Sequence, residues 1–423
     1  MKYRRRVVDE FLQKKLKIMG AVLIEGPKWC GKTTTGLYAS KSVLHLDDPA
    51  QKSLILDLAD LDPAMLLKGK TPRLLDEWQL TPKLWDSVRH EVDRRQQKGQ
   101  FILTGSSVPI DFSKISHSGI GRISSLTMRP MSLFESGEST GDISISSLFE
   151  NQLDISGAST LDLESIAFLL CRGGWPGAID LDDSSSMLIA SEYCYALQKS
   201  DLSRVDGVKK DPQRVERVLR SYARHQGSQA TKGKILQDIK DNDFQDISVD
   251  TIHSYLEALR KVFVIEDMPA WNPKLRSKAA IRSSDTRYFV DPSIAVGALG
   301  IGPQDLFNDL NTFGFLFEAM CIRDLRVYAQ AVDGDVYHFR DSNDLECDAV
   351  IHTRKGLYGL VEVKLGGERL IEEGAQNLKK LRETIDTTKM PEPVFLMVLT
   401  ATGSFAYRRK DGVLVVPLGS LRD

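Results

Sequence analysis

The eight residues from Gly26 to Thr33 read Gly-Pro-Lys-Trp-Cys-Gly-Lys-Thr and fit the spacing GxxxxGK[ST]. The glycines let the backbone turn tightly, so that its N–H groups can point at phosphate oxygens. In such a loop Lys32 reaches the β- and γ-phosphates of a nucleoside triphosphate, and the Thr33 hydroxyl binds Mg²⁺. The apolar run Ala21–Glu25 precedes the loop and helical sequence follows it, which is the context that the motif requires. The predicted phosphate site comprises Gly26, Pro27, Lys28, Trp29, Cys30, Gly31, Lys32, Thr33 and Thr34.

A pair of carboxylates follows a second apolar run. The strand predicted at Arg73–Asp76 ends in Asp76 and Glu77, at the edge where a parallel sheet faces its ligand. We expect Asp76 to lie near the metal ion. Glu77 can then orient or deprotonate the attacking water.

Small polar residues end a third strand. The predicted strand Phe101–Thr104 runs into Gly105 and Ser106. Because this strand end faces the same crevice, Ser106 is a candidate contact to the γ-phosphate or the water. A polar turn explains Ser106 equally well.

A second group of charged residues lies near the end of the sequence. Glu362 and Lys364 are two residues apart in a predicted strand, so alternation places both on one face. Asp348 in the preceding strand can meet them, and Glu318 on a predicted helix can supply a further carboxylate. This set suits Mg²⁺-assisted phosphodiester cleavage. Asp348 and Glu362 would hold the metal, and Lys364 would position water or stabilise charge.

Length and composition limit what surrounds these residues. The chain has 423 residues, which is enough for roughly two to four domains. Of these residues, 42% are hydrophobic and 27% are charged. A formal net charge of −2 excludes a polycation, so any nucleic-acid surface must be local. No apolar run approaches the ~18 residues needed to cross a bilayer, and the five cysteines show no paired spacing. We expect no membrane partner and a cytoplasmic location.

Periodicity predicts an α/β multidomain chain. Strands alternate with helices at the beginning, which predicts a parallel sheet covered on both faces, and a second α/β domain follows at the end. A connection with helical segments and a helix-rich module lie between them. The predicted parts are 1–135, 136–205, 206–300 and 301–423.

The module at 206–300 resembles a winged helix in its predicted elements. Three helices precede two strands, Val262–Glu266 and Arg287–Val290, around a basic turn. Two groups of cations could contact the phosphates of duplex DNA. They are Arg214, Arg217, Arg220 and Arg224 on the first helix, and Lys274, Arg276, Lys278 and Arg282 on the presumed wing. Solvated faces, or docking to a protein partner, explain both groups at least as well.

Residues 1–135 resemble an AAA-type P-loop ATPase. The Walker A residues are Gly26–Thr33, the Walker B pair is Asp76 and Glu77, and Ser106 falls at the sensor position. With the Gly-Gly-Trp-Pro-Gly element at 173–177, nearly the whole chain is similar to a prokaryotic family. Its members join an AAA domain to a C-terminal domain of unknown function, and their biological role is generally unassigned.

The AAA resemblance implies ATP and Mg²⁺ as cofactors. A Gly-Arg pair that recurs in the family corresponds to Gly121 and Arg122. Arg122 would act as an arginine finger within the subunit or across an interface, with a surface salt bridge as an equal alternative. Trp29 and Cys30 depart from the smaller residues usual in this loop and would reshape its mouth.

The C-terminal pattern resembles the PD-(D/E)XK restriction-endonuclease-like fold. The helix Glu318, the strand Asp348 and the Glu362-x-Lys364 pair are all present, and Gln376 would be the polar residue often found beside that site. Families with this fold often keep the scaffold and lose the chemistry.

Together these features predict an ATPase whose nucleotide state controls a C-terminal nuclease-like domain. One alternative is an ATP-gated DNA nuclease. Another is a nucleotide-dependent switch that barely hydrolyses ATP and docks to a protein. Besides ATP, the candidate partners are therefore duplex DNA, a protein, or a second copy of the chain.

Overall fold

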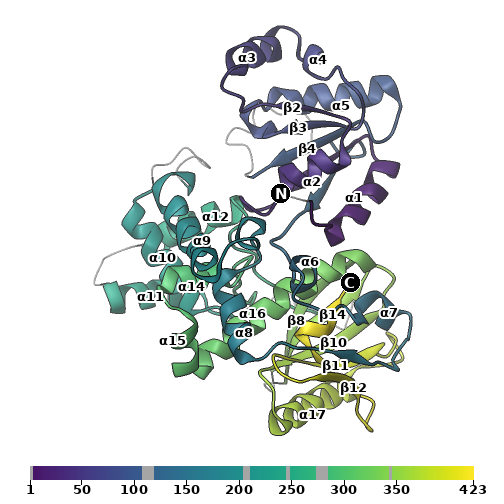
Figure 1. Cartoon of the computed structure of the whole chain (residues 1–423), viewed down its shortest axis with the longest axis vertical. Helices are drawn as coiled ribbons and strands as arrows, with labels where there is room; N and C mark the ends of the chain where they lie inside the picture. The colour runs from purple at the N-terminus through teal and green to yellow at the C-terminus, as the bar shows by residue number, and fades with distance from the viewer. Residues whose placement is uncertain (1–2, 107–118, 203–209, 244–247, 273–283, 343–344) are drawn as a thin grey trace. The chain divides into compact units, whose positions relative to one another are not determined.

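The computed structural model describes residues 3–106, 119–202, 210–243, 248–272, 284–342 and 345–423 (Figure 1). The chain forms two compact units. The first comprises Met1–Pro130, Ser200–Lys210 and Glu257–Val264, and the second comprises Met131–Lys199, Asp211–Leu256 and Ile265–Asp423. The finer division at residues 135, 205 and 300 stays a prediction.

A parallel sheet forms the centre of the first unit (Figure 1). In the part that the structure describes, its order is β2 (Ser42–His45), β3 (Arg73–Asp76), β4 (Phe101–Gly105), β1 (Ala21–Glu25) and β5 (Ile123–Thr127). All neighbouring strands pair in parallel, so their carboxyl ends share one edge of the sheet. The strands β1, β3 and β4 confirm the predicted apolar runs Ala21–Glu25, Arg73–Asp76 and Phe101–Thr104, and β5 was not predicted.

Helices bury both faces of this sheet. Leu12 of α1 packs with Ile24 and Ile102 on one face, and Val88 of α5 packs with Leu103 on the other. The helices of the unit are α1 (Val7–Ile18), α2 (Lys32–Ala39), α3 (Lys52–Leu61), α4 (Pro63–Leu66) and α5 (Lys83–Arg95). This arrangement confirms the predicted parallel sheet covered on both faces.

A mixed sheet forms the α/β part of the second unit. Its described order is β7 (Gly157–Ala158), β12 (Phe405–Arg408), β13 (Leu414–Pro417), β11 (Phe395–Thr400), β10 (Tyr358–Lys364), β9 (Glu346–Thr353) and β8 (Gly334–Arg340). The strands β8, β9 and β10 are antiparallel, whereas β10, β11 and β13 run parallel. Helix α16 (Leu310–Ala329) precedes β8, and α17 (Glu368–Thr384) connects β10 to β11. The strands predicted to carry Asp348 and the Glu362–Lys364 pair are present as β9 and β10.

Further elements complete the second unit. The short strands β6 (Ile143–Ser144) and β14 (Leu421–Arg422) pair in parallel. The helices are α6 (Leu133–Ser136), α7 (Ile145–Phe149), α8 (Leu163–Arg172), α9 (Asp183–Ala196), α10 (Pro212–Arg224), α11 (Lys232–Asp243), α14 (Ser293–Leu299) and α15 (Pro303–Asn308). Helix α12 (Val249–Lys261) follows α11 in the sequence. Asp211 caps α10, because its carboxylate accepts the N–H of Arg214 at 3.0 Å.

The predicted hairpin of the middle module forms only in part. The described residues show isolated antiparallel bridges at Ile265–Phe289 and Met268–Thr286 in place of two strands. Val264 donates its backbone N–H to Leu259 O at 2.9 Å, so this part of the predicted strand closes the end of α12. Phe263 takes a positive φ of 59°, which no extended strand allows. The four cations of the presumed wing lie outside the described residues.

A buried cluster of charges stabilises the second unit. The guanidinium of Arg323 on α16 donates to Asp291 Oδ2 at 3.0 Å and to Asp324 Oδ1 at 2.8 Å. All three side chains are buried. Each carboxylate also accepts a backbone N–H, from Gly174 at 3.0 Å and from Leu133 at 2.9 Å. Buried charges need such partners, so the cluster fixes how these segments pack.

The Gly-Gly-Trp-Pro-Gly element packs against this cluster. A Cβ on Gly174 would lie 2.1 Å from Met131 O, and Gly173 takes a φ of 73°, so both positions require glycine. The buried Trp175 indole donates to Ser293 Oγ at 2.9 Å. The element therefore has a structural role in the second unit.

Among the described residues, no helix combines the length and apolar character that crossing a membrane would require.

Replacing Asp291 with alanine should lower the free energy of unfolding by about 3–5 kcal/mol, because Arg323 loses a buried partner. Urea denaturation followed by circular dichroism measures the effect. The matched control is Glu373→Ala, since the Glu373–Arg369 pair is exposed and contributes at most about 1 kcal/mol. Equal effects of the two substitutions would contradict this account of the cluster.

Candidate functional site

The predicted phosphate loop connects β1 to α2, and its glycines are structurally required. Gly26 has a φ of 152°, and a Cβ there would lie 2.0 Å from Met128 O. Gly31 has a φ of 100° and caps α2. Between them, Trp29 is exposed with a φ of 64°, whereas Cys30 is buried. The two departures from the usual loop sequence thus face opposite environments, and only Trp29 is at the surface.

Arg6 fixes the loop from the segment before α1. Its guanidinium is buried and donates to Cys30 O at 2.9 Å and to Arg129 O at 2.8 Å. Sequence reasoning missed Arg6, because nothing local distinguishes it from the neighbouring Arg4 and Arg5. The Lys32 ammonium is also buried and donates to Pro27 O at 2.6 Å, so it stays within the loop.

Asp76 connects the loop to three neighbouring elements. Its Oδ1 accepts the hydroxyl of Thr33 on α2 at 2.8 Å and that of Thr104 on β4 at 2.5 Å. Its Oδ2 lies 3.1 Å from Nδ1 of His45 at the end of β2. The carboxylate is buried, as expected at the end of a central strand. The structure therefore brings together Thr33 and Asp76, the two predicted metal ligands.

Glu77 takes a left-handed conformation, with φ 57° and ψ 44°, directly after β3. Its carboxylate accepts a hydrogen bond from the Gln79 amide and one from Ser106 Oγ at 3.4 Å. Burial raises the pKa of Glu77 above its usual value, although Gln79 and Lys32 act in the opposite direction. A higher pKa makes the carboxylate a better general base. The predicted residues Glu77 and Ser106 thus meet.

Arg122 lies at the other edge of the sheet from the phosphate loop. It precedes β5, whose first residue Ile123 pairs with Ala21 at the beginning of β1, whereas the loop follows the end of β1. Its Nε donates to Asp93 Oδ1 at 2.8 Å on the surface. The structure contradicts an arginine finger within the subunit and shows the salt bridge instead. Action across an interface stays a prediction.

The second predicted site also assembles. The Lys364 ammonium donates to Glu362 Oε2 at 2.7 Å and lies 3.8 Å from Asp348 Oδ2. Asp348 Oδ2 also accepts the N–H of Val363 at 2.7 Å, which fixes β9 against β10. Glu318 on α16 is half-buried and accepts the Tyr288 hydroxyl.

The predicted polar partner from α17 was off by one residue. Asn377 donates to Glu362 Oε1 at 2.8 Å, whereas Gln376 is exposed and bonds Glu372. On a helix, adjacent residues point about 100° apart, so only one of them can face the sheet. Which of the two neighbouring amide side chains faces Glu362 depends on the orientation of α17 about its own axis.

Burial dominates the electrostatics of this second site. It raises the pKa of Glu362 to about 8, with the Asp348 charge acting in the same direction. It also raises the pKa of Glu318 well above its usual value. Burial alone would lower the pKa of Lys364, but the Asp348 and Glu362 carboxylates raise it overall. The site therefore groups three carboxyls around one ammonium, and a bound cation would favour their charged forms.

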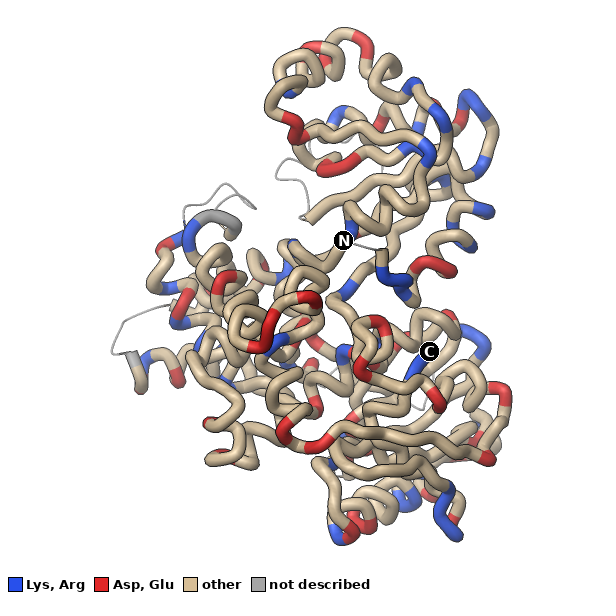
Figure 2. Tube along the Cα trace, in the orientation of Figure 1, with Lys and Arg blue, Asp and Glu red and all other residues tan. Residues whose placement is uncertain are grey.

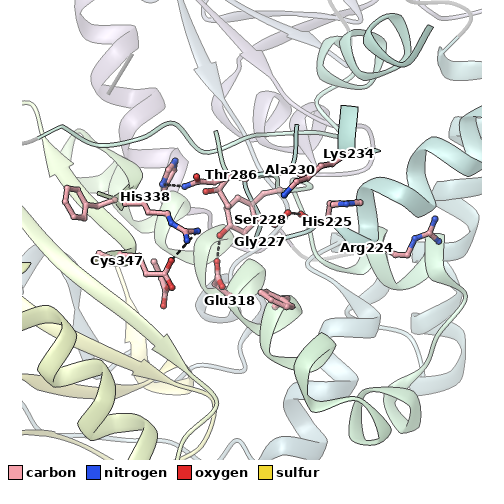
Figure 3. Close-up of a pocket in the computed structure, with 17 residues that line it drawn as sticks. Arg224, His225, Gly227, Ser228, Ala230, Lys234, Thr286, Glu318, His338 and Cys347 are labelled. Carbon is pink, nitrogen blue, oxygen red and sulfur yellow. Dashed lines mark hydrogen bonds and ion pairs between the residues drawn. The ribbon is translucent and has the colours of Figure 1, made fainter. Parts of the chain in front are cut away.

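A pocket of about 670 Å³ in the second unit opens onto this site (Figure 3). Glu318 and Asp348 lie on its wall, and cations from other elements line it as well. Those cations are Arg224, Lys234 and Arg340. A pocket that joins carboxylates to cations suits a phosphate-bearing ligand with a metal ion.

The group of arginines predicted on the first helix of the middle module, which is α10, is only partly open to a ligand. Arg224 forms a bidentate pair with Asp238 of α11, at 2.6 to 3.0 Å. Figure 2 shows Lys and Arg interspersed with Asp and Glu in both units, in keeping with the net charge of −2. Charge alone therefore gives little support for an extended DNA-binding face.

Three family models match separate parts of the chain. Residues 19–136 match an AAA domain, residues 163–305 match a domain of unknown function (DUF8612), and residues 313–421 match another (DUF4143). The first unit therefore contains an AAA-type P-loop domain, as its motif and parallel sheet predicted. The two domains of unknown function carry no assigned activity. The winged-helix-like module and the nuclease-like domain therefore stay proposals.

Two curated proteins and one solved structure are similar to larger parts of the chain. The uncharacterized proteins Mb2031c of Mycobacterium bovis and Rv2008c of Mycobacterium tuberculosis are each 23% identical over 367 residues. Each match covers 86% of this chain and 74% of the relative. The Walker-type ATPase PABY2304 of Pyrococcus abyssi matches at 15% identity and a TM-score of 0.42, over 69% of this chain and 94% of that one.

His338 in the pocket makes the second unit sensitive to acid. Burial lowers the pKa of His338 to about 4, and its Nδ1 accepts from the Gln229 amide at 3.2 Å, so the folded ring is neutral. Because the unfolded ring binds a proton near pH 6.5, the free energy of unfolding should fall as the pH drops from 6.5 to 4. The contribution is at most about 3 kcal/mol.

Urea denaturation at pH 7 and pH 4.5 measures this effect. His338→Gln should lose less stability between the two pH values than the wild type. The exposed His90 gives the control, and His90→Gln should follow the wild type. Equal pH dependence in the wild type and His338→Gln would contradict the account.

Proposed function

We propose that the chain is a Mg²⁺-dependent ATPase whose nucleotide state controls the C-terminal part. The observation that carries the proposal is the hydrogen bond of 2.8 Å between Thr33 and Asp76, with Glu77 directly following. This hydrogen bond joins the phosphate loop to the end of β3, where Glu77 would activate water. The AAA-domain match over residues 19–136 supports the same reading.

Each residue has a role that follows from its position. The loop N–H groups and Lys32 would bind the β- and γ-phosphates, and Glu77 would accept the proton of the attacking water. Ser106, which bonds Glu77, would hold that water or the γ-phosphate. A half-buried base beside a lysine suits the transfer of a proton near neutral pH.

The oxygen donors at this site fit Mg²⁺. The Thr33 hydroxyl and the Asp76 carboxylate are hard ligands on adjacent elements, which is the donor set this ion prefers. When bound, Mg²⁺ would neutralise charge on the β- and γ-phosphate oxygens. Thr104 would then keep the Asp76 carboxylate oriented, because it donates to the same oxygen as Thr33.

Control of the C-terminal part is proposed from the course of the chain. Segments of the first unit, Ser200–Lys210 and Glu257–Val264, are continuous in sequence with segments of the second. A change in the first unit would therefore be passed on through several covalent connections. The alternative is a switch that binds ATP, hydrolyses it slowly and docks to a protein partner.

Glu77→Gln should reduce the rate of phosphate release from ATP by about 10²–10⁴-fold, because it removes the base, and should leave ATP binding intact. Lys32→Ala should weaken ATP binding itself. The matched control is Glu10→Gln, an exposed carboxyl on α1 that should behave as the wild type. An unchanged rate in Glu77→Gln would reject the assignment. Tight ATP binding with negligible turnover in the wild type would favour the switch.

The second site favours a further candidate function, metal-dependent cleavage of a nucleic-acid phosphodiester. Four predicted residues, Glu318, Asp348, Glu362 and Lys364, lie close together, and two of them, Glu318 and Asp348, line a pocket that cations also line. Carboxylates next to a lysine can bind a metal and stabilise a developing negative charge. The resemblance to the PD-(D/E)XK fold points to the same chemistry.

Incubation with linear duplex and single-stranded DNA, Mg²⁺ and ATP tests this second function. Cleavage should fall at least about a hundredfold in Glu362→Ala, because a metal ligand is lost. Asn377→Ala should lower it about tenfold, since Asn377 holds Glu362, whereas the exposed neighbour Gln376→Ala should have no effect. Cleavage that survives in Glu362→Ala would reject the site. Equal cleavage by Lys32→Ala and the wild type would reject control by ATP.

A further inference from the structure

A third cluster of ligand-type side chains lies in the first unit, beside the nucleotide site. It comprises His45, Asp47 and Asp76, whose donor atoms all lie within 4.8 Å of one another. The register explains the arrangement, because β2 and β3 are parallel neighbours and pair His45 with Asp76 at the carboxyl edge. Asp47 follows two residues later and therefore reaches the same edge.

The two oxygens of the Asp76 carboxylate have different partners. Oδ1 accepts the hydroxyls of Thr33 and Thr104, at 2.8 and 2.5 Å. Oδ2 lies 3.1 Å from the imidazole Nδ1 of His45. One oxygen therefore belongs to the proposed nucleotide site, and the other belongs to the β2 side. A ligand on the β2 side need not compete with Thr33.

The donor set on that side differs from that of the nucleotide site. An imidazole nitrogen and two carboxylates favour first-row transition ions, whereas Mg²⁺ prefers oxygen ligands alone. Bonds of about 2.0–2.2 Å to one ion place its donors roughly 3–4 Å apart, close to the observed spacing. His45 and Asp47 are exposed, so their side chains can make the remaining adjustment and an ion can enter from solvent.

Electrostatics supports a cation at this place. Asp47 and Asp76 place two carboxylates beside the His45 imidazole, whereas the Lys32 ammonium is held by Pro27 O on the loop side. A dication beside His45 would offset the repulsion between these two carboxylates from the β2 side.

We propose that His45, Asp47 and Asp76 form a binding site for one first-row transition-metal ion of the Mn²⁺ or Co²⁺ type. The ion binds without nucleotide and is separate from the Mg²⁺ that accompanies ATP. Asp76 bridges the two positions through its two oxygens. The site goes beyond the proposed ATPase activity, because its ion is bound whether or not ATP is hydrolysed.

The full-length chain is freed of metal with a chelator and titrated with Mn²⁺ in the absence of nucleotide. Electron paramagnetic resonance of free Mn²⁺ gives the stoichiometry and the dissociation constant. We expect one site, which His45→Ala and Asp47→Asn each weaken by about tenfold or more. His90→Ala, an exposed histidine on α5 of the same unit, should bind as the wild type does.

Two further variants separate this site from the nucleotide site. Thr33→Ala removes a partner of Asp76 Oδ1 only and should retain Mn²⁺ binding, although it should weaken binding of Mg²⁺ with ATP. With Co²⁺, His45→Ala should change the visible absorption, since the nitrogen ligand is lost. Asp47 is exposed after the end of β2, so Asp47→Asn tests the site even where His45→Ala fails to fold.

The outcomes are distinct from those of the ATPase test. Absence of Mn²⁺ binding in the wild type, or equal binding in the wild type, His45→Ala and Asp47→Asn, would overturn the proposal. Loss of nucleotide-free binding in Thr33→Ala alone would overturn it as well, by assigning the ion to the nucleotide site. A chain that fails to hydrolyse ATP but binds Mn²⁺ through His45 would refute the ATPase and support this site.

Discussion

The Asp76 carboxylate is the interaction on which the first unit's site depends. It is buried at the end of a central strand and accepts hydroxyls from a helix and a neighbouring strand, Thr33 at 2.8 Å and Thr104 at 2.5 Å. A buried charge is tolerated only with such partners. The parallel sheet supplies them, because all of its strands end at one edge. That edge positions three parts of the site: the phosphate loop, the proposed base Glu77, and His45.

The second unit also contains buried charged side chains, which lie in two clusters. In the first, Arg323 donates to Asp291 and Asp324, and each carboxylate also accepts a backbone N–H, so the cluster serves packing. In the second, Glu362 is buried and Lys364 is half-buried, and a pocket lined by Glu318 and Asp348 lies beside them. Access to a pocket therefore separates the candidate site from the structural cluster, although both consist of acids around one cation.

The two proposed activities share one kind of chemistry. Both sites place carboxylates and a lysine where a metal ion and a phosphate group would meet. They differ in access: Lys32 begins α2 directly after the predicted phosphate loop, whereas Lys364 lies 3.8 Å from Asp348, which lines a pocket of about 670 Å³. A loop suits the terminal phosphates of a nucleotide, and a pocket suits a larger phosphodiester.

The sequence by itself determined the features that depend on short stretches of chain. The loop at 26–33, the strand ending in Asp76 and the Glu362–Lys364 pair were predictable, since spacing and alternation fix them locally. The strand at Val262–Glu266 was not, because its first residues instead close the end of α12.

Only the tertiary structure decided which distant residues meet. Arg6 on the phosphate loop, His45 beside Asp76 and Asn377 on Glu362 come from separate elements, and their neighbours in sequence look equally suitable. Arg122 lies at the wrong edge for catalysis within the subunit, because its strand β5 runs parallel to β1. Strand order and helix rotation set these distances, and they result from packing the whole core, which no single stretch of sequence encodes.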